Sequence, residues 1–184
     1  MQTSIQRIVL IPRRGATAAD AFYPWLRSQI SIPMIVPDML RPQQPRVREW
    51  TPLVLAQVWV NPEQTLLVGH GLGALAAVRA AAQLPEGARL GGLLGVGGWW
   101  TTTSRWAGSA AWLKDDVDLN RARKAAQDRC RVLLSDDDPI PGEPDANPGR
   151  WARRMGAQVK TVSGAGRFDQ AEAPDVLKAI LEMI

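Results

Sequence analysis

Short apolar runs alternate with longer segments of helical periodicity along this chain. Runs such as Ile8-Val9-Leu10-Ile11 and Leu66-Leu67-Val68 are continuous, which is typical of strands buried on both faces of a parallel sheet. Between these runs, apolar residues recur at the spacing of an amphipathic helix. We predict strands at 7–12, 32–36, 65–69, 89–96, 131–134 and 158–162. We predict helices at 18–30, 46–60, 71–84, 119–127, 148–155 and 174–184.

This alternation of strands and helices predicts the fold class. It indicates an α/β protein with three layers, in which a doubly wound, mainly parallel sheet is covered by helices on both faces. The length of 184 residues fits a single domain that spans 1–184. Ligands bind such sheets beyond the carboxyl ends of the strands, so we expect a site among the loops that follow the strands.

Composition and charge narrow the function classes. The net charge of +4 raises the possibility of nucleic-acid binding, but the densest basic segment, 121–131, is accompanied by Asp118 and Asp128 and favours a solvated helix face. One histidine and one cysteine, Cys130, cannot supply an internal disulfide or the usual zinc site. No apolar run approaches the roughly 18 residues that span a bilayer, and no secretory signal is recognisable. We therefore expect a cytoplasmic protein with no cofactor, no metal and no membrane or nucleic-acid partner.

The segment Gly69-His70-Gly71-Leu72-Gly73 carries the main chemical signal. It joins a predicted strand to a predicted helix with almost no loop, as the Gly-x-Ser-x-Gly nucleophile elbow does. Gly71, however, occupies the position of the serine. Taken alone, the segment is equally well explained as a tight turn. The dinucleotide-binding fingerprint is excluded because Ala74 stands where its last glycine would be.

Two later loops make the elbow more specific. The loop 135–141, with Asp136-Asp137-Asp138, and the loop 163–168, with Gly166-Arg167-Phe168, follow the last two predicted strands. They resemble the acid-bearing and histidine-bearing loops of α/β-hydrolases, in the order nucleophile, acid, base. Over nearly its whole length the chain resembles the α/β-hydrolase superfamily, and in particular the small serine hydrolases related to retinoblastoma-binding protein nine and to the YdeN-like proteins.

The resemblance implies serine, aspartate and histidine at three positions where this chain has Gly71, Asp138 and Arg167. Without a hydroxyl no acyl-enzyme can form, and an arginine, with a pKa above about 12, cannot serve as the general base. We therefore predict a degenerate triad with no intact catalytic residue, and a pseudoenzyme that acts as a ligand- or protein-binding module. Whether Arg167 pairs with Asp138 stays open.

An active enzyme is the alternative prediction. A carboxylic-ester hydrolase would need a relocated constellation, for example one that uses Ser135 or Ser163, or a shifted assignment of the loops. In the family that the chain resembles, the residue before the nucleophile points away from the cleft, so we expect His70 to be a hydrogen-bonded structural residue. We expect Cys130 to be buried and unreactive.

Tryptophans follow the strand that ends at Val96, on the side where substrates enter such sheets. They either pad an irregular loop over the core or line a pocket, and both interpretations remain open. We predict a cleft for a small apolar ligand or a protein partner, lined by residues from three of the loops: Arg13, His70, Leu72, Trp99, Trp100 and Trp106.

Overall fold

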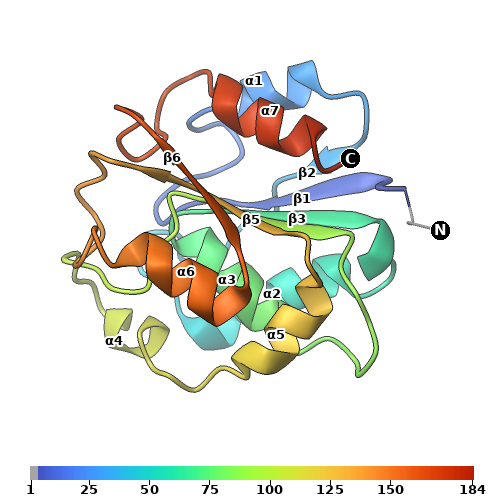
Figure 1. The fold of residues 1–184 in the computed structure, drawn as a ribbon, viewed down its shortest axis with the longest axis horizontal. Helices are drawn as coiled ribbons and strands as arrows, with labels where there is room; N and C mark the ends of the chain where they lie inside the picture. The colour runs from blue at the N-terminus through green and yellow to red at the C-terminus, as the bar shows by residue number, and fades with distance from the viewer. Residues whose placement is uncertain (1–3) are drawn as a thin grey trace.

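In the computed structural model, which describes residues 4–184, six parallel strands form one sheet in the order β2-β1-β3-β4-β5-β6 (Figure 1). The long apolar runs occupy the centre, where every residue of β3 and β4 is buried. The strands are β1 (Arg7–Ile11), β2 (Met34–Ile35), β3 (Thr65–His70), β4 (Gly92–Val96), β5 (Cys130–Ser135) and β6 (Gln158–Val162).

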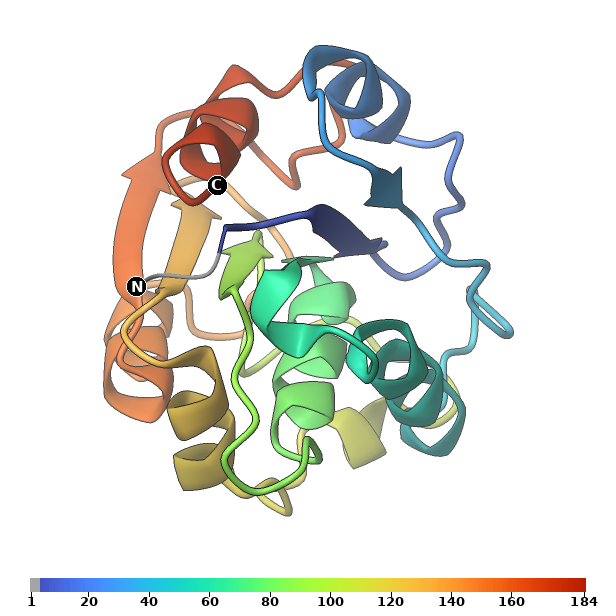
Figure 2. The same ribbon diagram turned by 90° about the vertical axis from the view of Figure 1, so that its right-hand side faces the viewer.

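Helices cover both faces of the sheet (Figures 1 and 2). One face carries α1 (Tyr23–Gln29) and α7 (Pro174–Leu181). The other face carries α2 (Val47–Val58), α3 (Leu72–Ala81), α5 (Leu119–Ala126) and α6 (Asn147–Met155). The short helices η1 (Pro62–Gln64) and α4 (Ser109–Trp112) lie in the connections. This arrangement confirms the predicted α/β class with a doubly wound parallel sheet.

Each layer of helices encloses its own apolar core. On one side, Phe22, which precedes α1, and Leu26 of α1 pack with Val176 and Ile180 of α7 against the sheet. On the other side, α3 is buried along its entire length, and its alanines allow close approach by α2 and α5. Central burial of α3 holds its amino terminus, and with it the elbow, in a fixed place at the end of β3.

Several predicted boundaries were wrong at the ends of elements. Helix α1 begins at Tyr23, not at residue 18, because Pro24 suits the first helical turn and Thr17 bonds the side chain of Asp20 in a preceding turn. Strand β2 is only two residues long, since Pro33 and Pro37 flank it and cannot donate to the sheet. These changes leave the loops at the carboxyl ends of the strands where they were expected.

Candidate functional site

The carboxyl ends of β1 and β3 mark the point where the strand order reverses. The chain runs from β1 to β2 on one side and places β3 on the other, which is where α/β sheets bind ligands. A narrow cleft of about 60 Å³ opens here between the loops that follow β1, β3, β4, β5 and β6. It is lined by these residues that the sequence had singled out: Arg13, His70, Gly71, Leu72, Trp99, Trp106, Asp138 and Arg167.

The elbow has the sharp strand-to-helix geometry that its sequence predicts. Gly71 lies between β3 and α3 with φ +53° and ψ −117°, and its N–H donates to Val96 O at 2.8 Å. Two positions later a Cβ on Gly73 would lie 2.2 Å from Ile11 O, so only glycine allows α3 to approach β1 this closely. The backbone therefore presents position 71 to the cleft, but no hydroxyl is attached to it.

His70 is buried beneath the elbow and both of its ring nitrogens are bonded to protein. Nε2 lies 2.7 Å from the carbonyl oxygen of Arg167, which can only accept, so Nε2 carries the hydrogen. Nδ1 then accepts from the hydroxyl of Tyr23 at 2.7 Å, and the same hydroxyl oxygen accepts the N–H of Arg13 at 3.1 Å. Burial lowers the pKa of His70 to about 4, so the ring is neutral near pH 7. Through Tyr23 the imidazole links the loop after β1 to the loop after β6, and it leaves no nitrogen for a serine.

The acid and base positions are occupied by Asp138 and Arg167. Asp138 Oδ1 accepts the N–H of Ile140 at 2.9 Å, and burial raises the pKa of this carboxyl. Arg167 pairs through Nε with Asp169 Oδ2 at 3.7 Å, and the other oxygen of Asp169 accepts from Arg13 Nε. Within residues 4–184 no ion pair joins Arg167 to Asp138. The arginine at the position where the resemblance implies a histidine is therefore paired with a different carboxylate.

The tryptophans divide between the cleft and the core. Trp99 and Trp106 line the cleft and pack edge to face, with ring centroids 6.4 Å apart. Trp100 lies outside it, 4.7 Å from the ring of Trp151. Trp112 is buried against Trp50. Of the three tryptophans predicted to line the cleft, Trp99 and Trp106 do so, while Trp100 is partly buried and packs against the core.

Four further residues, which the sequence had not singled out, also line the cleft: Arg14, Gly97, Ser104 and Ile140. Arg14 had a signal, since it adjoins Arg13 in the loop after β1. Its guanidinium lies 5.0 Å from the centroid of the Trp106 ring. Ser104 had none, because it belongs to an irregular segment whose path depends on tertiary packing.

Over residues 4–184, the candidate nucleophiles Ser104, Ser135, Ser163 and Cys130 have no histidine or amine as a hydrogen-bond partner. Ser135 Oγ donates to Asp137 Oδ1 at 2.6 Å, and Ser163 Oγ donates to Asp136 Oδ2 at 2.8 Å. Burial raises the pKa of Cys130 to about 12, so it is a neutral thiol in the core. No hydrogen bond joins Ser104 Oγ to a basic side chain in the part of the chain that the structure describes. None of these groups has the activated form that a nucleophile needs.

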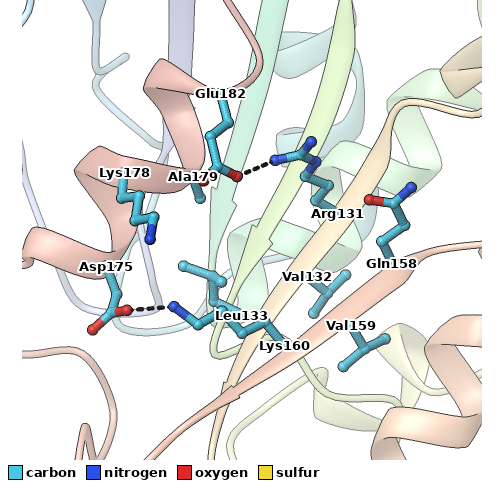
Figure 3. Close-up of a pocket in the computed structure, with 10 residues that line it drawn as sticks. All are labelled: Arg131, Val132, Leu133, Gln158, Val159, Lys160, Asp175, Lys178, Ala179 and Glu182. Atoms are coloured by element: carbon cyan, nitrogen blue, oxygen red, sulfur yellow. Dashed lines mark hydrogen bonds and ion pairs between the residues drawn. The ribbon is translucent and has the colours of Figure 1, made fainter.

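A larger groove of about 360 Å³ lies between α7 and the strands β5 and β6 (Figure 3). Its charges are largely compensated, because Arg131 pairs with Glu182 and Lys160 pairs with Asp175, each at 2.6 Å. It also faces the amino-terminal halves of both strands, away from the loops that carry the triad positions. The smaller cleft at the elbow is therefore the candidate site.

Within residues 4–184, no group of three or more His, Cys, Asp or Glu side chains could hold a metal ion. No helix in the same range is long and apolar enough to cross a bilayer.

Comparison with known proteins gives the family. The model of the serine hydrolase family matches residues 9–182. The chain belongs to the serine hydrolase family. YdeN of Bacillus subtilis (strain 168), which is named as a hydrolase, is 22% identical to it over 182 residues, 97% of this chain and 94% of YdeN.

Solved structures of two similar proteins have the same fold as this member of the serine hydrolase family. The crystal structure of the ydeN gene product from B. subtilis covers 97% of this chain and 98% of its own, with a TM-score of 0.84 and 22% identity. A protein named as a hydrolase of the alpha/beta superfamily, from Xanthomonas campestris pv. campestris, covers 98% of both chains with a TM-score of 0.67 and 16% identity. The expected resemblance to small α/β-hydrolases of the YdeN-like type is confirmed.

Proposed function

We propose that this member of the serine hydrolase family is catalytically silent and uses the cleft at the elbow as a binding site. The observation that carries the proposal is Gly71, which has the backbone geometry of a nucleophile elbow and no nucleophile. The general base is lost as well as the nucleophile, because Arg167 has a permanently charged guanidinium where the family resemblance implies a proton acceptor.

The chemistry of the family cannot run on the groups that remain. Acyl transfer needs a nucleophile within hydrogen-bond reach of a base. The one histidine of the chain is held by Tyr23 and by the carbonyl of Arg167, so it cannot take a proton from a hydroxyl in the cleft. Asp138, left without an imidazole to orient, bonds a backbone amide instead.

Features useful for binding persist. Leu72 is the first residue of α3, so its N–H has no acceptor inside the helix and remains available to an occupant of the cleft. Leu72 and Trp99 also supply apolar surface beside the elbow. A small molecule with an apolar part, or a side chain from a protein partner, suits this combination.

An active hydrolase is the second candidate, and the presence of Ser104 in the cleft favours it. The structural neighbours also include the type II thioesterase BorB, with a TM-score of 0.64 and 21% identity over 97% of this chain. An ester or thioester hydrolase that used Ser104 would need a general base, and within residues 4–184 no basic side chain is hydrogen-bonded to the Ser104 hydroxyl. For this reason we favour the binding role over the hydrolase.

Two assays separate the candidates. The purified chain is treated with a fluorophosphonate probe, and hydrolysis of p-nitrophenyl butyrate is compared with that of Asp138→Ala. We expect no labelling and no difference in rate. We also expect no turnover from Gly71→Ser alone, because Arg167 still occupies the base position, and a trace from Gly71→Ser combined with Arg167→His.

The silent-enzyme proposal fails if the wild-type chain labels with the probe. Peptide mapping of the label would then identify the nucleophile, with Ser104, Ser135 and Ser163 as the residues to inspect. Robust turnover from Gly71→Ser alone would instead refute the role assigned to Arg167.

A further inference from the structure

The candidate cleft is unusual in its charge. Arg13, Arg14 and Arg167 all line it. The carboxylates beside these arginines are Asp138, in the lining, and Asp169, which pairs with two of them. Among these described groups one positive charge is uncompensated when both carboxylates are ionised. An anionic group is the complement of such a cleft.

Asp169 contacts Arg13 and Arg167 in a way that leaves terminal nitrogens of their guanidinium groups available to a ligand. It contacts both Arg13 and Arg167 through Nε. A guanidinium carries five N–H donors, so this contact uses only part of each group. In the described residues the terminal nitrogens of Arg167 have no protein acceptor, and Arg13 uses only Nη1, toward Arg14 O at 3.2 Å. Asp169 thus orients both arginines through Nε and leaves terminal N–H groups without a protein acceptor among residues 4–184.

The size of the cleft limits the ligand. A volume of about 60 Å³ holds about four water-sized groups, which is a carboxylate with one or two further carbons. The apolar part of the ligand would lie against Leu72 and Trp99, which line the cleft and are buried. Arg14 is turned to the side wall, where it stacks on Trp106 and donates to Gln43 O at 3.0 Å.

We propose that the cleft binds a small organic carboxylate, held by the terminal nitrogens of Arg13 and Arg167 with its apolar part against Leu72 and Trp99. Guanidinium groups form paired, charge-assisted hydrogen bonds with carboxylates and phosphates alike. The apolar residues Leu72 and Trp99 in the lining favour a carboxylate that carries a short carbon chain over inorganic phosphate. The inference rests on the proposed function, since it takes the elbow to be a binding site. Asp169 is a positioning residue. The negative charge of Asp138 disfavours binding of the carboxylate.

The test is a titration of the ¹⁵N-labelled full chain with butyrate, followed by NMR at the Leu72 amide and at the arginine Nε groups. We expect saturable shifts at the cleft. Arg167→Gln removes one set of charge-assisted bonds but keeps the carbonyl that binds His70, and it should weaken binding by about tenfold or more. Lys178→Gln removes the same charge in the distant α7 groove of Figure 3 and should leave the affinity within about twofold.

A second variant separates charge from structure. Asp138→Asn keeps the oxygen that accepts the Ile140 N–H but removes the opposing charge, so it should tighten butyrate binding by about threefold or more. A purely structural role for Asp138 would leave the affinity unchanged or weaken it, and either result would overturn the electrostatic account.

Ligand controls decide the class. Butyramide, a neutral analogue, should bind at least about tenfold more weakly than butyrate, and inorganic phosphate should also bind more weakly. Equal binding of butyramide, tighter binding of phosphate, or equal losses in Arg167→Gln and Lys178→Gln would each overturn the proposal. A chain that binds no butyrate and stays unlabelled by fluorophosphonate would refute only this inference. A labelled chain would refute the proposed function itself.

Discussion

Replacing Gly71 with serine restores the family's nucleophile and should cost stability. The backbone at this position has φ +53° and ψ −117°, a conformation that residues with a Cβ rarely adopt. Such strain costs on the order of 1–3 kcal/mol. The new Cβ would also lie 3.2 Å from Arg13 Cβ, so the loop after β1 must give by a few tenths of an ångström. We expect the free energy of unfolding to fall by about 2 kcal/mol.

Urea unfolding followed by tryptophan fluorescence measures this loss as a lower midpoint at an unchanged m value. Gly87→Ser is the matched control, since Gly87 has φ +81° and a Cβ there would meet no atom within 4 Å. It should lose only the backbone contribution, about 1 kcal/mol. The reasoning is refuted if Gly71→Ser is as stable as the wild type, or if Gly87→Ser loses more than Gly71→Ser. A confirmed loss would mean that the glycine at position 71 stabilises the fold.

Other consequences concern the buried groups around the elbow. Because burial lowers the pKa of His70 to about 4 from 6.5, the unfolded chain binds a proton in this range that the native chain does not. Stability should therefore fall as the pH drops from about 6.5 to about 4, by up to about 3 kcal/mol for this residue. His70→Gln should flatten that part of the pH profile, and an unchanged slope would contradict the assignment. Tyr23→Phe leaves Nδ1 of His70 and the N–H of Arg13 without a partner, and urea unfolding should show a loss of about 1–3 kcal/mol. A midpoint equal to that of the wild type would exclude this. Cys130 should react with a thiol reagent only as the chain unfolds, because its buried thiol has a pKa of about 12. Rapid reaction of the native protein would show that the residue is accessible.

The order of the elements could be predicted from the sequence because it depends on local patterns. Continuous apolar runs such as that of β3 are stable only between two layers of helices, so their alternation with helical segments already implies the doubly wound sheet. The ends of elements were less predictable, as at Tyr23, where a tertiary contact with His70 and a local turn compete with helical periodicity. Trp100 could not be separated from Trp99 either, since neighbours in an irregular segment point by packing and not by a fixed period.

The absence of a hydroxyl at 71 and of a proton acceptor at 167 follows from residue identity alone. A glycine has no hydroxyl and an arginine cannot accept a proton, whatever the fold around them. The contacts that these positions make instead depend on the tertiary structure. Asp169 joins Arg13 to Arg167 across more than 150 residues of chain. His70 links the same two loops through the hydroxyl of Tyr23 and the carbonyl of Arg167. Such contacts depend on how distant loops meet at the end of a sheet, which no local pattern of residues encodes.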